Sequence, residues 1–263
     1  MTAQTYLLTP GELDDAVPGQ TFQLTGTEAH HAVRVQRVRA GEQIDLVDGV
    51  GVRAVGTVTS VDGVVGRGAS PVLNLHVDEV RHEENDAAGI VLVQGLAKGG
   101  RDEMAVEAAT GLGVERIIPW AAARSVAVWS GERAERGRRR WEAIARAETT
   151  VARRAWVPRV DGIMTTAGLA EAIWTGDLAG AQVLVLHESA TVGLGQAIRQ
   201  AEAAPPRMTV LVVGPEGGVA PEELSTLSDA GAAPVRLGKA ILRSSSAGPA
   251  ALAALKTLHH QWD

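Results

Sequence analysis

The distribution of apolar and polar residues divides the chain into two regions. Up to about residue 75, short segments alternate apolar and polar positions, and glycine or aspartate separates them. Examples are "EQIDLVDG" (42–49), "RAVGTVTSVDG" (53–63) and "LNLHVDEV" (73–80). A period of two is typical of half-buried strands joined by tight turns. The first region is therefore expected to form a small antiparallel barrel or sandwich.

One helix is expected to interrupt these strands. Thr25 is followed three residues later by Glu28, which is the pattern of a capping box. In the helix that follows, His30, Arg34 and Arg37 have the spacing i, i+4 and i+7 and would share one face. That face is either an ordinary solvated surface or a small basic patch for phosphate groups.

From about residue 88, apolar strands alternate with helices. Strands are expected at 89–96, 116–120, 181–189, 208–214 and 233–238, and helices at about 101–114, 132–154, 193–203, 221–231 and 249–262. Continuous apolar strands alternating with helices indicate a mainly parallel sheet covered on both faces. The polar stretch 80–89 resembles a linker, so we expect one domain at 1–78 and a second at 79–263.

Composition narrows the class of protein. The 263 residues are 45% hydrophobic and 21% charged, as in ordinary soluble globular proteins. No apolar run approaches the roughly 18 residues of a membrane helix, and the N-terminus lacks the basic region of a signal peptide. The absence of cysteine excludes disulfides and thiol nucleophiles. The sequence therefore predicts a cytoplasmic protein without a membrane partner.

Charge is unevenly distributed along the chain. The formal net charge is -6, yet nine arginines and only three glutamates lie between residues 133 and 159. The planar guanidinium group suits phosphate oxygens better than the ammonium group of lysine does. The cluster is either the solvated face of a helix in an arginine-rich protein or a phosphate-binding surface.

Three of the expected strands end in segments suited to binding a ligand. These are "LHES" (186–189), "GPEGG" (214–218) and "LGKAILRSSSAG" (237–248). Open α/β sheets bind ligands at the carboxyl ends of their strands, and the glycines would allow the backbone to approach a ligand closely. Backbone N–H and C=O groups suit a neutral heterocycle such as adenine better than a polyphosphate.

Other kinds of site are disfavoured by the sequence. Walker and dinucleotide-binding glycine motifs are absent. The adjacent histidine pairs 30–31 and 259–260 point to different sides of a helix, so no metal site is expected. Ser244, Ser245 and Ser246 occupy an expected loop, but the chain has no G-x-S-x-G motif, and a serine hydrolase is improbable.

The stretches "VVGPEGGVAPEEL" and "VRLGKAILRSSSAGPAAL" resemble the SPOUT superfamily, and specifically the bacterial small-subunit ribosomal RNA uridine-N3 methyltransferases. That family's pattern is roughly G-P-E-G-G followed by L-G-x-x-I-L-R-x-E-T-A. "HAVRVQRVRAGEQIDLVDG", "ERIIPWAAARSV" and "RRAWVPRV" add to the resemblance, which extends over nearly the whole chain.

The resemblance implies an α/β C-terminal domain whose deep trefoil knot binds S-adenosyl-L-methionine. It also implies a PUA-like N-terminal β-barrel that helps to hold RNA, and a homodimer. The implied reaction is methylation of N3 of a uridine in 16S ribosomal RNA, either free or in the assembled small subunit. Two alternatives remain open: another SPOUT RNA methyltransferase, such as one acting on ribose 2'-hydroxyls, and a noncatalytic RNA- or ribosome-binding relative.

The resemblance also assigns residues. Arg243 would handle the target nucleotide, and Glu216 would either remove a proton or cap its own loop. RNA would contact Arg34, Arg37, Arg138, Arg139, Arg140 and Arg154. The cofactor would contact Leu186, His187, Gly214, Pro215, Glu216, Gly217, Gly218, Leu237, Gly238, Ile241 and Leu242.

Three motifs depart from the family pattern. Ser245 replaces the glutamate of L-R-x-E-T-A, and Gly111 replaces the glutamate of a T-E-L-G motif. Thr150 and Val151 stand where the family has a glutamate-glutamine pair. These departures are the reason that the noncatalytic alternative is retained.

Overall fold

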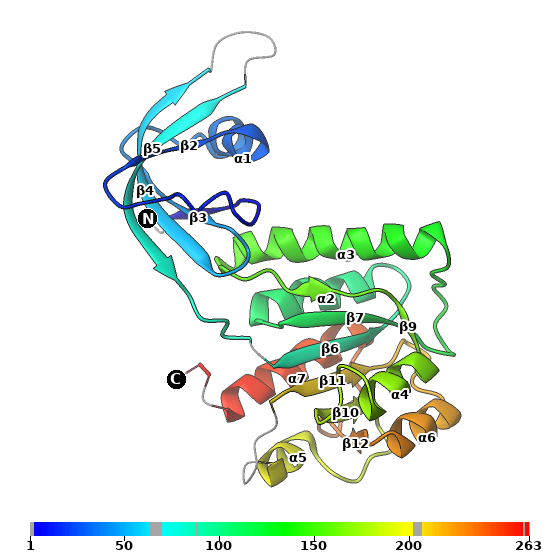
Figure 1. Cartoon of the computed structure of the whole chain (residues 1–263). Helices are drawn as coiled ribbons and strands as arrows, with labels where there is room; N and C mark the ends of the chain where they lie inside the picture. The colour runs from blue at the N-terminus through cyan, green and yellow to red at the C-terminus, as the bar shows by residue number, and fades with distance from the viewer. Residues whose placement is uncertain (1–2, 64–69, 88, 202–206, 260, 263) are drawn as a thin grey trace. The chain divides into compact units, whose positions relative to one another are not determined.

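The computed structural model describes residues 3–63, 70–87, 89–201, 207–259 and 261–262. The chain folds into two compact units (Figure 1). The β-rich unit comprises Met1–Asn85 and Thr149–Val157, and the α/β unit comprises Asp86–Glu148 and Pro158–Asp263. The β-rich unit thus extends past residue 78 and includes a distant segment that the linker at 80–89 did not indicate.

The β-rich unit is built on a five-stranded sheet in the order β1-β3-β4-β5-β2. Three of its strand pairs are antiparallel, as the alternation predicts, and β1 pairs with β3 in parallel. On β5, Leu73, Leu75 and Val77 are buried, while the side chains between them are more exposed. The strands are β1 Gln4–Leu7, β2 Thr21–Leu24, β3 Gln43–Val47, β4 Val52–Asp62 and β5 Val72–His82.

The helix of this unit differs from its prediction. It begins directly after Thr25, as expected, but the side chain of Thr25 makes no capping hydrogen bond. It starts as α1 (Gly26–His30) and continues with π-helical winding as η1 (His31–Gln36). Arg37 is its C-cap, in the left-handed conformation with φ 58°. The expected single face of His30, Arg34 and Arg37 assumed regular α-helical spacing, so that prediction was wrong.

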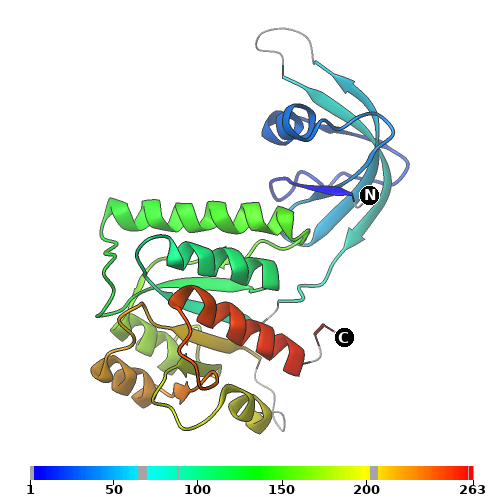
Figure 2. The ribbon, with the colours of Figure 1, turned by 180° about the vertical axis from the view of Figure 1, so that it is seen from behind.

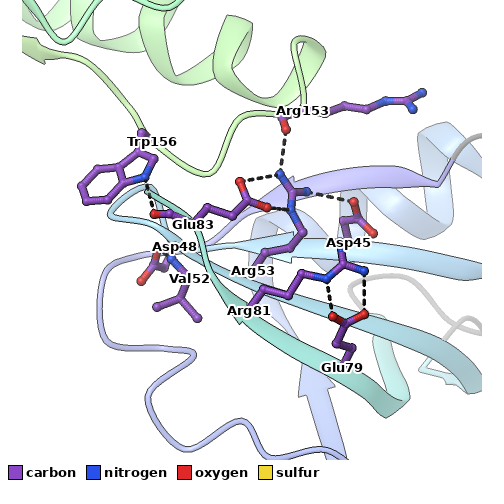
Figure 3. A network of polar contacts seen from close by, with 9 residues as sticks. All are labelled: Asp45, Asp48, Val52, Arg53, Glu79, Arg81, Glu83, Arg153 and Trp156. Atoms are coloured by element: carbon purple, nitrogen blue, oxygen red, sulfur yellow. Dashed lines mark hydrogen bonds and ion pairs between the residues drawn. The ribbon is translucent and has the colours of Figure 1, made fainter. Parts of the chain in front are cut away.

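A network around Arg53 joins Thr149–Val157 to the sheet of the same unit (Figure 3). The buried guanidinium of Arg53, on β4, donates to Asp45 Oδ2 at 2.9 Å and to the carbonyl oxygen of Arg153 at 2.8 Å, and it also pairs with Glu83. Trp156 Nε1 donates to the carbonyl oxygen of Glu83 at 2.9 Å. The segment is therefore held by both side-chain and backbone contacts.

The α/β unit contains a seven-stranded sheet in the order β12-β10-β11-β6-β7-β8, with β9 paired to β7. All of its described strand pairs are parallel, as predicted. Its strands are β6 Ile90–Gly95, β7 Arg116–Ala121, β8 Arg159–Val160, β9 Met164–Thr165, β10 Gln182–Leu186, β11 Thr209–Val213 and β12 Ala233–Val235.

Helices cover both faces of this sheet. Leu92 and Leu211 pack on one face with α2, α3, α5 and α7, whereas Val91 and Val210 pack on the other with α4 and α6. Figure 2 shows α7 beside α2 on the first face. The bounds are α2 Arg101–Leu112, α3 Glu132–Val151, α4 Thr166–Trp174, α5 Leu194–Ala201, α6 Pro221–Asp229 and α7 Ser244–Leu258.

Helix α7 begins earlier than the sequence indicated. Ser244, Ser245 and Ser246 form its first turn and are not part of a loop. Gly248 lets this helix approach the sheet, because a Cβ there would lie 2.9 Å from Leu92 Cδ1. The trefoil knot stays a prediction. None of the described helices combines the length and apolar character needed to cross a bilayer.

Candidate functional site

The strands β10, β11 and β12 are parallel neighbours, so their carboxyl ends meet at one edge of the sheet. Strand β10 ends at Leu186, β11 at Val213 and β12 at Val235. The three segments singled out from the sequence follow these ends. They form the walls of two adjoining cavities in the α/β unit.

The larger cavity has a volume of about 530 Å³ and the smaller one about 100 Å³. Leu186, Glu188, Ile241, Leu242 and Ala247 line both. Every residue that the sequence assigned to the cofactor or to the reaction lines at least one of them. The larger cavity has Leu186, Gly214, Pro215, Glu216, Gly217, Gly218, Ile241, Leu242 and Arg243, and the smaller one adds His187, Leu237 and Gly238.

The 214–218 loop needs glycine at specific positions. A Cβ on Gly214 would lie 2.9 Å from Val219 Cγ2, and a Cβ on Gly217 would lie 2.9 Å from Arg124 Cβ. Gly218 has a φ of 72°, a left-handed conformation that side chains disfavour. At these three positions the loop therefore presents backbone to the larger cavity, as expected from the glycine pattern.

Glu216 fixes this loop to the segment after β6. Its Oε1 accepts from the backbone N–H of Lys98 at 3.1 Å and from Arg101 Nη1 at 2.9 Å. Burial alone would raise the pKa of Glu216. Hydrogen bonds from its own backbone N–H and from Lys98, together with Arg101, outweigh that effect and hold the pKa below its usual value. The geometry favours the loop-capping role over proton transfer.

His187 lines the smaller cavity, and its ring is held by Ser189. Its Nδ1 lies 2.8 Å from Ser189 Oγ and accepts from the Ser189 backbone N–H at 3.2 Å. An Nδ1 that accepts from an N–H places the ring proton of the neutral tautomer on Nε2. The backbone N–H of His187 donates to the carbonyl oxygen of Val235 at 2.9 Å, which joins the first and third segments.

Arg243 caps α7 and its side chain is exposed. Within the described residues, its guanidinium has no ion pair. Ser244 and Ser245, the next two residues, are buried, and Ser244 lines the larger cavity. The position that carries glutamate in the family pattern is thus a buried hydroxyl in a helix.

Two charged side chains of the larger cavity were missed by sequence reasoning. Arg101, the first residue of α2, lines the larger cavity, and exposed Glu188 lines both cavities. Within the described part of the chain, the Glu188 carboxyl group has no hydrogen bond or ion pair. Glu188 could have been found, because it lies inside "LHES". Arg101 could not, since it follows β6, and only the segments after β10, β11 and β12 had been singled out from the sequence.

The arginines predicted to bind RNA belong to both units. On α3, Arg138 pairs with Glu135 and Glu142, Arg139 pairs with Glu135 at 3.0 Å, and Arg140 pairs with Glu103 at 2.7 Å. Exposed pairs of this kind contribute little to stability, so they exchange readily for other partners. Arg34, Arg37 and Arg154 lie in the β-rich unit.

Comparison with known proteins gives a family for both units. Residues 83–256 match the model of an RNA methyltransferase domain, and residues 24–63 match that of an RNA methyltransferase PUA domain. Ribosomal RNA small subunit methyltransferase E of Mycobacterium bovis is 42% identical over 95% of this chain and 92% of its own length. The chain belongs to the ribosomal RNA small subunit methyltransferase E family.

Other members of the ribosomal RNA small subunit methyltransferase E family agree with this assignment. The Bacillus subtilis protein is 29% identical over 94% of this chain and 93% of its own length. A crystal structure of the Neisseria gonorrhoeae protein bound to S-adenosyl methionine has a TM-score of 0.78 and 26% identity, and it covers 98% of each chain. The SPOUT and PUA-like fold expected from the sequence is thereby confirmed.

At one position that departs from the family pattern, another glutamate lies close by in the structure. Gly111 replaces a family glutamate, but a Cβ at Gly111 would lie 2.6 Å from Glu148 Oε1. The carboxyl group of Glu148 therefore occupies the space beside Gly111. Burial, and then the charge of Glu107, raise the pKa of Glu148. Among the described residues, no group of three or more acidic or histidine side chains could hold a metal ion.

Proposed function

We propose that this protein transfers a methyl group from S-adenosyl-L-methionine to N3 of a uridine in small-subunit ribosomal RNA. One observation carries the proposal most strongly. The residues that the family pattern assigns to the cofactor come from three separate segments, and all of them line two adjoining cavities. Family membership and the similar protein crystallised with S-adenosyl methionine support the same conclusion.

The cavities fit this cofactor. Their combined size is within the range of about 300–1,000 Å³ that is usual for small-molecule sites. The backbone of 214–218 and 237–238 offers N–H and C=O groups to a heterocycle, and Leu186, Ile241 and Leu242 offer apolar contacts. When bound, S-adenosyl-L-methionine supplies an electrophilic methyl group on a sulfonium.

Arg243 is proposed to contact the target uracil. The N3 nitrogen must lose its proton to attack the methyl carbon, and until the N–C bond has formed the negative charge is shared with the neighbouring carbonyl oxygens. The sulfur of the cofactor would leave as a neutral thioether. The guanidinium group of Arg243 lines the cavity and has no ion pair with any described residue, so it can stabilise this charge.

Glu188 is proposed to accept the N3 proton. It lines both cavities that are proposed to hold the cofactor, and within the described residues its carboxyl group has no hydrogen bond or ion pair. Glu216 is less suited to this role, because Arg101 and Lys98 already engage its carboxylate and lower its pKa. Glu216 is instead proposed to hold the cofactor loop in place.

RNA is proposed to contact Arg34, Arg37 and Arg154 in the β-rich unit and Arg138–Arg140 in the α/β unit. Each phosphate contact should contribute about 0.7–0.9 to the slope of log affinity against log salt concentration. We further propose that the protein acts as a cytoplasmic homodimer on the RNA or on the assembled small subunit. Light scattering would test the dimer by giving twice the mass of the chain.

The proposed function is tested on small ribosomal subunits, and on naked small-subunit RNA, that lack the modification. Each is incubated with the protein and cofactor, digested, and analysed by mass spectrometry for methylated nucleosides. We expect 3-methyluridine with the wild-type protein and little with Arg243→Ala. A 2'-O-methylated nucleoside would instead support another methyltransferase activity, and cofactor binding without any product would contradict the proposal.

A further inference from the structure

We propose that Arg101 is a second RNA-contacting residue of the cavity and binds the phosphate of the target nucleotide. This inference rests on the proposed function. Arg101 lines the larger cavity from the start of α2, whereas the other walls come from 186–188, 213–219 and 241–247. It therefore brings a charged side chain to a cavity whose cofactor walls are mostly backbone and apolar groups.

The contacts of Arg101 leave most of its hydrogen-bonding capacity available. Its side chain is 38% exposed, and Nη1 donates to Glu216 Oε1 at 2.9 Å. No other side-chain partner for it occurs among the described residues. A guanidinium group has five N–H donors, so a fork of two parallel donors remains for a phosphate.

Glu216 keeps this fork in place. Its carboxylate is itself fixed by the Lys98 backbone N–H and by its own backbone N–H. An arginine held in this way loses less conformational entropy on binding than a freely rotating one. Glu216 thus positions Arg101 as well as the 214–218 loop.

The charged residues of the larger cavity leave one cation for a phosphate beside the cofactor. Its charged lining residues are Arg101, Arg243, Glu188 and Glu216. Glu216 is hydrogen-bonded to Arg101, and Glu188 is proposed to accept the N3 proton. Arg243 is proposed to contact the uracil, so Arg101 is the remaining cation of this cavity that can bind the phosphate.

The test compares Arg101→Gln with Arg199→Gln, which removes the same charge from an exposed position on α5 outside both cavities. Methyl transfer to RNA is measured over a range of salt concentrations, and cofactor affinity is measured by calorimetry. For Arg101→Gln we expect cofactor affinity within about twofold of wild type, an RNA KM raised about tenfold, and a salt slope smaller by about 0.7. Arg199→Gln should match wild type in all three.

Glu216→Gln and the double variant separate RNA binding from support of the loop. If Arg101 acted only as the partner of Glu216, both single variants and the double variant would have equal effects. The proposal requires Arg101→Gln to raise the KM for RNA more than Glu216→Gln does. An RNA KM and salt slope of Arg101→Gln equal to those of Arg199→Gln would overturn it, whereas a wild-type protein without methylated product would overturn the proposed function itself.

Discussion

Glu216 accepts hydrogen bonds from Lys98 and Arg101, and these lower its pKa in the folded protein. A carboxyl group with a lowered folded-state pKa stabilises the fold above its unfolded pKa. That stabilisation is lost as pH falls through the folded-state pKa. The carboxylate is therefore expected to stay ionised throughout the neutral range.

The prediction is tested by urea unfolding of the wild type and Glu216→Gln between pH 7 and pH 2. The wild type should be the more stable protein at neutral pH, and the difference should shrink as pH falls below about 4, the ordinary range of a glutamate. A difference that stays constant with pH would show that the charge of Glu216 contributes nothing.

Glu188 provides a second prediction at the residue scale. If it accepts the N3 proton, Glu188→Gln should lower kcat by about 10²–10⁴-fold, the usual contribution of a general base. Cofactor affinity should change little, because a glutamine keeps the size of the side chain. Raising the pH should partly restore the rate of the variant, since solvent then removes the proton more readily. A Glu188→Gln enzyme with full kcat would exclude this role.

The sequence indicated where the backbone shapes the cavity wall, because glycines mark those positions. Gly214, Gly217 and Gly218 occur where side chains would collide or require a left-handed backbone. Arg101 and Glu188, which sequence reasoning did not single out, contribute charged side chains to the larger cavity. Glu216 lies 115 positions from Arg101, and no local pattern predicts that pair.

At the scale of elements, the 214–218 loop has little tolerance for side chains. Gly214→Ala would press a methyl group against Val219 and the backbone of Gly218. We expect a loss of cofactor affinity of about tenfold or more, because about 1.4 kcal/mol of strain suffices for that change. Gly162→Ala is the control, since a Cβ there meets nothing within 4 Å. Calorimetry that finds equal affinities for both variants would contradict the prediction.

Two arginines on neighbouring strands provide a matched test of burial (Figure 3). Arg53 on β4 is buried among Asp45, Glu83 and the carbonyl oxygen of Arg153. Arg53→Ala should lower the free energy of unfolding by about 3 kcal/mol, because it leaves partly buried carboxylates without their partner. Arg81→Ala breaks only an exposed pair with Glu79 and should not change stability measurably. Denaturant unfolding of both variants gives the comparison.

Element types were more predictable than their ends. Five of the seven parallel strands were located by their apolar runs, whereas the short strands β8 and β9 and the helix α4 had no counterpart in the prediction. The first turn of α7 was taken for a loop, since three successive serines favour turns as well as helix starts. The π-helical winding of η1 had no counterpart in the prediction, which assumed a regular α-helix.

At the scale of the whole molecule, the β-rich unit depends on a segment from the middle of the chain. Leu7 and Val47 are buried in a cluster with Ala155, and Trp156 and Val157 pack against it. A fragment of residues 1–85 would expose this apolar surface and lose the contacts of Arg53. It should unfold at a lower denaturant concentration than the same fragment joined by a flexible linker to 149–157. Equal midpoints would show that the segment is dispensable.

The two-unit organisation was only partly visible in the sequence. A change from alternating to continuous apolar patterns separated the β-rich region from the α/β region. The return of Thr149–Val157 to the β-rich unit gave no such signal, because its composition is continuous with the basic helix before it. Contacts with segments distant in sequence place Thr149–Val157 in the β-rich unit.

The three crossings of the chain between its units also determine the order in which the protein can be completed during synthesis. Residues 1–85 leave the ribosome first, but their unit lacks its last segment until Val157 has emerged. At about 5–20 residues per second, this leaves the β-rich unit without the 149–157 segment for several seconds. During that interval the apolar side chains that Ala155 and Trp156 later cover remain open to chaperones, so the β-rich unit is completed only after much of the α/β unit has been made.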